Sequence, residues 1–425
     1  MASTESRAKR IIRAALRASL LLGVTGCGAD FDSPDIVKTL RVLAVQKDHP
    51  YAAPSTDPAN LNRVHLSMLS YDGAQKSPGE PRKIQRLWFS GCDDLPGDQY
   101  FTCLVRMYFL WQAYYDPAVP VVRLPWQDGM SWSPIDDIPA DIPAEQRAQL
   151  VQAIVAQVDP TMPAELAESY LSTFRIGAGS TFEYPIPPRI IENHQPSSDP
   201  TLPPYGLSFI FFTACAGQLE LAPEWKNIDF KTQLRNATLG FPFICVDDSG
   251  AALGPDDFVA GYSQQFVYAG REYNNPVIDG ANFNGTETSS AARCLGDGCI
   301  EPTMPSCVDD TSKQLPHVPA CTGKCPTYEF SPVMNPDADG NKVDAFASQT
   351  GSVDKQMWIN YYTDKGSLKH SVRRLRDVDP SVGWNTDNYA TTWTPPASPG
   401  PVNLWAAVHD TRGGVAWTRL LVCVD

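Results

Sequence analysis

Cysteine is the residue type whose number and spacing most clearly indicate chemistry in this chain of 425 residues. Five of the 11 cysteines fall between Cys294 and Cys325, with the spacing C-x₄-C-x₇-C-x₁₃-C-x₃-C. A structural zinc site of this kind would need paired C-x₂-C knuckles. That stretch contains none, and His317 is the one histidine near it. The spacing therefore favours oxidised pairs over a metal centre.

Apart from Cys27, the cysteines form an even set, which disulfides could use completely. The candidates are Cys92, Cys103, Cys215, Cys245, Cys294, Cys299, Cys307, Cys321, Cys325 and Cys423. The sequence suggests a local bridge Cys92–Cys103 around a Pro-Gly turn, a bridge Cys215–Cys245 between strands, a short loop Cys294–Cys299, and a bridge from Cys423 to one of the others. The full connectivity does not follow from the sequence.

The N-terminus has the order of regions found in a secretory signal peptide. Basic residues between Arg7 and Arg17 precede a short apolar run from Ala18 to Val24, and small residues follow. The run is shorter than the roughly 20 apolar residues of a transmembrane helix. The sequence Val-Thr-Gly-Cys that ends at Cys27 resembles the lipobox of bacterial lipoproteins.

The lipobox resemblance implies that residues 1–26 are removed and that the Cys27 thiol carries the lipid. Gly28 at the next position implies sorting to the outer membrane of the cell envelope, and residues 27–35 would be a tether. Because this tether is short, we expect the first folded domain to lie close to the membrane and the second beyond it.

Composition narrows the class of partner. The formal net charge is −14, and removal of residues 1–26 leaves 29 basic and 47 acidic residues, a net charge of −18. Such an acidic chain is poorly suited to nucleic acid or to anionic lipid surfaces. After Cys27 no apolar run is long enough to span a membrane. The lipid is therefore the expected membrane attachment.

Two further patterns could bind ligands. Oxygen-bearing side chains precede and follow Gly340 at alternate positions, as in calcium loops: Asn335, Asp337, Asp339, Asn341 and Asp344. Phe346 stands where an EF-type loop needs Glu, so an exposed acidic turn is the preferred interpretation, and no cofactor is expected. Aromatic residues between Tyr108 and Trp132 could stack on sugars, but such residues more commonly form cores.

The sequence contains no established catalytic motif. It lacks a Gly-x-Ser-x-Gly elbow, a His-Glu-x-x-His pair and a phosphate-binding glycine loop. Its six histidines are scattered, and His409 beside the Asp410 turn is expected to be exposed at a strand end. We therefore predict that the chain is not an enzyme.

Alternating apolar residues predict an all-β fold of two Ig-like β-sandwich domains in tandem. Strands are expected in the first domain, residues 36–273, at 36–46, 62–71, 86–90, 207–216, 241–247 and 259–268. Apolar residues at helical spacing predict a helical hairpin at about 142–175, inserted in that domain.

The second domain, residues 274–425, is expected to be disulfide-rich and to end in a hairpin of residues 402–409 and 415–424. Its ending, TWTPPASPGPVNLWAAVHDTRGGVAWTRLLVCV, resembles the last strands of Ig-like and PKD-like sandwich domains. The resemblance extends weakly to the strand of Trp358 and, by analogy, to that of Trp88. It implies a fold of Gram-negative envelope lipoproteins and supplies no active site.

Together these features predict a lipid-anchored envelope protein that acts as a non-catalytic binding or structural module. Its partners would be the membrane, through the lipid, and a protein or glycan of the envelope. Two alternatives remain open: an envelope enzyme or accessory subunit acting on glycan or peptide, and a calcium-dependent adhesin.

Replacing Cys27 by Ser tests the anchor. Without the thiol there is no acceptor for the lipid, so the Cys27→Ser protein should leave the membrane fraction when cells are fractionated. A variant that still sediments with membranes would contradict the lipoprotein interpretation.

Overall fold

A computed structural model describes residues 33–77, 80–94, 127–139, 141–156, 161–195, 203–223, 241–271, 273–300, 306–308, 310, 313–342, 355–379, 381–385 and 388–425. The chain divides into two compact units, Met1–Pro34 and Asp35–Asp425. Cys27 lies outside the described residues, so the fold below is that of the second unit. Among the residues described, no helix has both the length and the apolarity that crossing a membrane requires.

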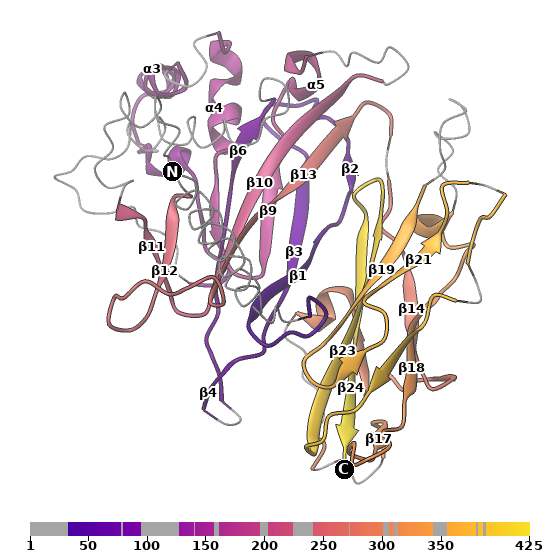
Figure 1. Ribbon diagram of the computed structural model, residues 1–425. Coiled ribbons are helices and arrows are strands. Elements are labelled where there is room, and N and C mark those ends of the chain that lie inside the picture. Colours follow the sequence, from indigo (N-terminus) through magenta and orange to yellow (C-terminus); the bar gives the residue numbers. More distant parts are fainter. Residues whose placement is uncertain are drawn as a thin grey trace, which may run out of the picture. The chain divides into compact units, whose positions relative to one another are not determined.

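The first half of the unit is a sandwich of two sheets, which we call the N-terminal sheets (Figure 1). One has three antiparallel strands in the order β1 (Leu40–Lys47), β3 (Arg63–Asp72), β9 (Thr181–Pro185). The other has six strands in the order β2 (Tyr51–Ala52), β13 (Phe258–Tyr268), β10 (Tyr205–Cys215), β6 (Gln85–Asp93), β8 (Ile176–Ala178), β7 (Ser131–Trp132). Val64, Leu66 and Met68 alternate along β3 and pack with Trp88 and Ile210 in the core between the sheets.

The six-stranded sheet is also covered on its other face. Phe89, Phe209 and Phe211 pack there in a second core. The hairpin of β11 (Gln218–Leu221) and β12 (Phe243–Val246) lies over this core, and the Cys215–Cys245 disulfide fastens it. Both faces of β10 are therefore covered, and all of its residues except Tyr205 are buried. This explains its unbroken apolar sequence.

A small helical insertion interrupts the strands, as the sequence predicted. It contains the 3₁₀ helix η3 (Pro134–Asp137) and the helices α3 (Ala144–Val155) and α4 (Ala164–Ser172). Val151 and Val155 of α3 pack against Leu171 of α4 in a core of their own. Two short elements complete this half, the helix α5 (Ile190–Asn193) and the hairpin of β4 (Gln75–Ser77) and β5 (Glu80–Pro81).

The second half, which we call the C-terminal sheets, is also built from two sheets (Figure 1). One has the order β15 (Thr286–Glu287), β14 (Ile278–Phe283), β18 (Tyr328–Met334), β22 (Thr391–Thr394), β20 (Ser367–Leu368). The other has the order β16 (Arg293–Leu295), β24 (Val415–Val424), β23 (Gly400–Asp410), β19 (Met357–Thr363), β21 (Val372–Arg376), with β17 (His317–Val318) parallel to β24. Short 3₁₀ helices are η4 (Gly296–Cys299) and η5 (Asp339–Asn341). The prediction of a mainly β protein is thus confirmed.

The predicted terminal hairpin is present as β23 and β24. Residues pair from Gly400 with Val424 to His409 with Val415. Asp410 fixes the turn, because its Oδ1 accepts hydrogen bonds from the backbone N–H groups of Arg412 and Gly414, both at 2.8 Å. An Asp side chain that caps nearby amides in this way is typical of tight turns.

The two sets of sheets share a core. Leu43, Ala44 and Leu69 of the three-stranded sheet pack against Trp405 and Trp417 of the hairpin. Leu40, Val64, Leu66 and Met68 of the same sheet pack in the N-terminal core on the other side. The three-stranded sheet is therefore buried on both faces, and the two halves are joined by packing as well as by the chain.

Polar groups lie beside this shared core. The Tyr71 hydroxyl donates to Asp364 Oδ2 at 3.0 Å, and Asn403 Nδ2 donates to the same oxygen at 2.6 Å. Arg419 Nε donates to Asn403 Oδ1 at 2.8 Å, and the guanidinium carbon lies 5.8 Å from the centre of the Trp405 ring. Burial raises the pKa of the Asp364 carboxyl, and hydrogen bonds from Asn403 and Tyr71 oppose that rise. These directional bonds fix how the N-terminal and C-terminal sheets align across the apolar contact.

The described chain enters the unit against the C-terminal sheets. Val37 N donates to Thr363 O and Thr363 N donates to Asp35 O, both at 2.8 Å. Residues 35–37 thus pair with β19 before β1 begins, a contact that the sequence did not predict. Sequence order does not determine which sheet the first segment joins.

Replacing Trp417 by Ala tests the shared core. The side chain is fully buried, so its loss should lower the free energy of unfolding by about 3–5 kcal/mol in urea titrations. Val372→Ala, at an exposed valine on β21, is the control and should change stability by less than about 0.5 kcal/mol. Two separate unfolding transitions, only one of which moves, would show that the halves do not share a core.

Candidate functional site

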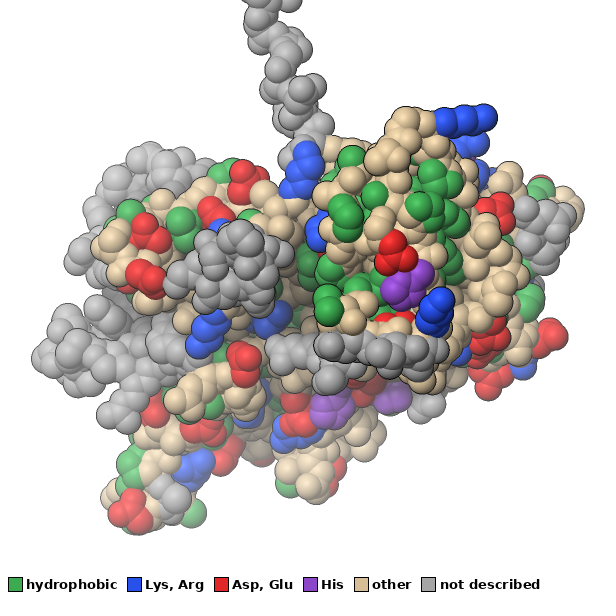
Figure 2. Space-filling model, turned by 90° about the horizontal axis from the view of Figure 1, so that it is seen from below, with side chains coloured by type: hydrophobic (Ala, Val, Ile, Leu, Met, Phe, Trp, Pro, Cys, Tyr) green, Lys and Arg blue, Asp and Glu red, His purple; other side chains and the backbone are tan. Residues whose placement is uncertain are grey.

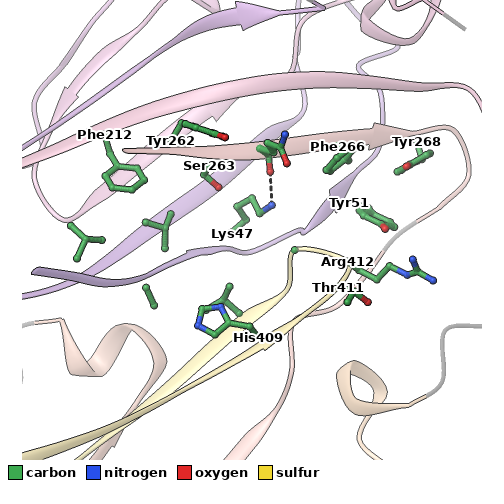
Figure 3. Close-up of a pocket in the computed structure, with 16 residues that line it drawn as sticks. Lys47, Tyr51, Phe212, Tyr262, Ser263, Phe266, Tyr268, His409, Thr411 and Arg412 are labelled. Carbon is green, nitrogen blue, oxygen red and sulfur yellow. Dashed lines mark hydrogen bonds between the residues drawn. The ribbon is translucent and has the colours of Figure 1, made fainter. Parts of the chain in front are cut away.

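An open groove of about 570 Å³ lies where the edge of the N-terminal sandwich meets the β23–β24 hairpin (Figure 3). Strand β1 and strand β13 line one side, and the other side is lined by His409, Thr411, Arg412, Gly413 and Val415. We call it the β13 groove. The lining residues that carry its chemistry are Lys47, Tyr51, Phe266, Tyr268, His409 and Arg412.

The outer edge of β13 opens onto this groove. Strand β10 pairs with β13 along its whole length, whereas β2 pairs with it at Phe266 and Val267. Side chains two residues apart lie on the same face of a strand. Tyr262, Gln264, Phe266 and Tyr268 therefore form a row along one face, and all four line the groove.

Aromatic rings cluster at one end of the groove. The ring centre of Tyr51 lies 4.8 Å from that of Tyr268 and 6.2 Å from that of Phe266. Tyr205 extends the cluster behind them, 5.8 Å from both Phe266 and Tyr268. These rings are half-buried, so each is held by its neighbours and still presents surface to a ligand.

Lys47, at the end of β1, is a buried cation in the groove. Its side chain is only 3% exposed, and Nζ donates to the backbone carbonyl of Gln264 at 2.6 Å, the bond drawn in Figure 3. Burial lowers the pKa of Lys47 to about 8, and the nearby Asp410 carboxylate opposes the shift. The ammonium thus remains mostly charged at neutral pH with a neutral oxygen as its hydrogen-bond acceptor.

Asp410 is itself committed to other groups. Its Oδ2 lies 4.0 Å from Lys355 Nζ and accepts the Tyr273 hydroxyl at 3.1 Å. Lys355 Nζ also lies 5.0 Å above the Tyr273 ring. Burial raises the pKa of the Asp410 carboxyl, and Lys355 opposes that rise. Two ammonium groups, those of Lys47 and Lys355, are therefore stabilised by this one carboxylate.

His409 is mostly buried, which corrects the expectation of an exposed strand end. Strand β23 extends to Asp410, so His409 lies inside the strand, paired with Trp358 on β19. The two rings stack at 5.5 Å with an angle of 14°. Among the described residues, none forms a hydrogen bond with its Nε2 atom. Burial lowers the pKa of His409 to about 4, so the ring is neutral at pH 7.

The structure joins most of the candidate cysteines. It pairs Cys215 with Cys245, Cys294 with Cys299, Cys307 with Cys423, and Cys321 with Cys325. Cys92 is also disulfide-bonded, and Cys103, the partner suggested by the sequence, lies outside the described residues. Cys299 has a further role, because it packs in the shared core. None of the cysteines that the structure describes lines the β13 groove.

Two of the oxygen-bearing side chains of the calcium candidate, those of Asp339 and Asn341, are used in other contacts. Asn341 is buried, accepts from Val277 N at 2.9 Å and donates to Asn335 O at 2.8 Å. The exposed Asp339 pairs with Lys342 at 2.9 Å. Asp344 lies outside the described residues. Within the described part of the chain, no three His, Cys, Asp or Glu side chains converge as metal ligands would.

Sequence reasoning missed the groove. The aromatic stretch it selected lies mostly outside the described residues, and only Trp132 can be placed, half-buried against the second core. The alternation of Tyr262, Gln264, Phe266 and Tyr268 was a usable signal for one wall. The opposite wall comes from residues 409–415, which no local pattern links to β13.

Comparisons with known proteins add little. No protein-family model matches the chain, and no curated protein matches it. Among solved structures, it is similar to dimeric latent PorU from Porphyromonas gingivalis, with 10% identity and a TM-score of 0.15. The match covers 92% of this chain and 24% of that chain, so this chain spans about a quarter of its length. Such a weak likeness carries no argument about activity.

The pH dependence of stability tests the placement of His409. Because its pKa falls from 6.5 to about 4 on folding, the unfolded chain binds a proton in that range that the folded chain does not. The stability that His409 contributes above about pH 6.5 is lost as the pH falls through about 4. His409→Phe keeps a ring against Trp358 but cannot titrate, so its unfolding free energy should fall less between pH 7 and pH 4 in urea titrations.

His65→Gln is the matched control, since the His65 side chain is 62% exposed. It should follow the wild-type pH profile. Parallel profiles for wild type and His409→Phe would show that His409 is solvated.

Proposed function

We propose that this chain is a lipid-anchored protein of the bacterial outer membrane that binds a ligand in the β13 groove without changing it chemically. The lipid would be carried by Cys27. The N-terminal and C-terminal sheets would correspond to two Ig-like domains, residues 36–273 and 274–425. The partner would be another component of the cell envelope or an extracellular molecule.

The composition of the groove carries this proposal. Its lining combines ring faces with the cations Lys47 and Arg412, and no Asp or Glu is among the described residues that line it. Hydrolysis of a glycan by the common two-carboxylate route needs a pair of acids. Ring faces with a few polar groups are, in contrast, typical of binding sites.

The surface charge supports the exclusion of nucleic acid as a partner. On the face seen in Figure 2, the basic side chains of the described residues are scattered among acidic ones. A nucleic acid is bound by basic groups gathered in one area. Together with the net charge of −14, this favours a protein or glycan partner.

The proposal can be tested with the full-length protein purified in detergent. Envelope polysaccharides and peptides would be screened for binding, and any ligand measured again with Tyr268→Ala. Removal of a ring from the groove should weaken binding about ten-fold or more. Chemical analysis of the recovered ligand should show it unchanged.

Tyr328→Ala is the matched control, because Tyr328 is also half-buried and stacks on Phe283 at 5.5 Å, but in the C-terminal sheets. Equal loss of binding in both variants would place the ligand site elsewhere. Turnover of the ligand would favour an envelope enzyme instead.

A further inference from the structure

We propose that the ligand of the β13 groove is an acidic saccharide, with its sugar ring on the aromatic cluster and its anionic group toward Lys47 and Arg412. This inference rests on the proposed function and specifies the ligand class.

Lys47 has no direct counterion among the described residues. An ammonium group has three N–H donors, and among the described residues its acceptor is the neutral carbonyl of Gln264. The carboxylate that acts on it, Asp410, forms its ion pair with Lys355. A buried cation without a direct counterion is costly, so an anion in the groove would be stabilised there.

Two arginines also lie near the rings of the groove. Arg412 lines the groove on the hairpin side, and its backbone N–H is fixed by Asp410. The guanidinium carbon of Arg271 lies 5.9 Å from the centre of the Tyr268 ring. In a chain with net charge −14, this part of the surface gathers cations around an aromatic cluster. Such a cluster selects a ligand that carries both an anionic group and an apolar face.

Ser263 and Thr411 also line the groove, and both carry hydroxyl groups. A saccharide supplies hydroxyls for these groups and C–H faces for the rings of Tyr51, Phe266 and Tyr268.

The same contacts argue against an extended peptide. A peptide would add as a strand to the open edge of β13 and would need its carbonyl and N–H groups. The Gln264 carbonyl on that edge is already occupied by the Lys47 ammonium. Lysine side chains commonly block strand edges in this way.

The test is calorimetry of the full-length protein in detergent with an oligogalacturonate, the matching neutral oligogalactoside, a sugar phosphate, an acidic hexapeptide and AMP. We expect an acidic sugar to bind at least ten-fold more tightly than the neutral one. The galacturonate and phosphate arms show which anionic group the groove prefers. Raising the salt concentration should weaken only the acidic ligand.

Two variants separate the contribution of the cation to binding from that of the aromatic ring. Lys47→Gln keeps an amide donor for Gln264 and should remove the preference for acidic over neutral sugar. Tyr268→Leu should weaken both sugars about ten-fold. Lys369→Gln makes the same charge change at an exposed lysine outside the groove, and it should leave binding unaltered.

If Lys47→Gln fails to fold, the salt dependence of ligand binding by the wild-type protein tests the preference for an acidic sugar. Equal affinity for neutral and acidic sugars, or no heat with any sugar at millimolar concentration, would overturn the inference. If only the hexapeptide or AMP binds, and Tyr268→Leu weakens that binding, the ligand is not a saccharide. The proposed function would then still hold, because the ligand lies in the groove. A ligand whose binding no groove variant alters would overturn the proposed function itself.

Discussion

The packing of the three-stranded sheet between two cores is the contact on which the rest of the structure depends. Leu43 and Leu69 face the hairpin tryptophans, whereas Leu66 and Met68 face Trp88 on the opposite side. Apolar area buried on both faces stabilises such a sheet without further covering elements. The β13 groove exists because this packing holds the β23–β24 hairpin beside the sandwich edge.

Local sequence patterns accounted for most elements of the fold. Alternation along residues 62–71 predicted β3, and the two apolar runs on either side of the Asp410–Gly414 turn predicted β23 and β24. Helical spacing located the insertion of α3 and α4. The predicted disulfide Cys215–Cys245 is present, because β10 and β12 lie in adjacent layers. These features depend on neighbours in sequence or on one buried face.

The candidate site did not follow from such patterns. His409 was expected at an exposed strand end, yet a neighbouring strand places Trp358 over it. Lys47 looked like an ordinary polar residue at the end of a strand, and only the approach of β13 and the Asp410 turn buries it. The contact of Lys47 with Gln264 joins residues 217 positions apart. No local propensity encodes such a contact.

The pairing of residues 35–37 with Thr363, and of Gln46 with Val415, sets an order for folding. The earliest part of the folded unit to be synthesised finds its partners among the last strands. Its first sheet therefore stays uncovered on one face until almost the whole chain is available. Contacts of such long sequence separation slow folding. The growing chain therefore exposes an apolar face of this sheet for most of its synthesis, and such a surface is prone to aggregation until the last strands cover it.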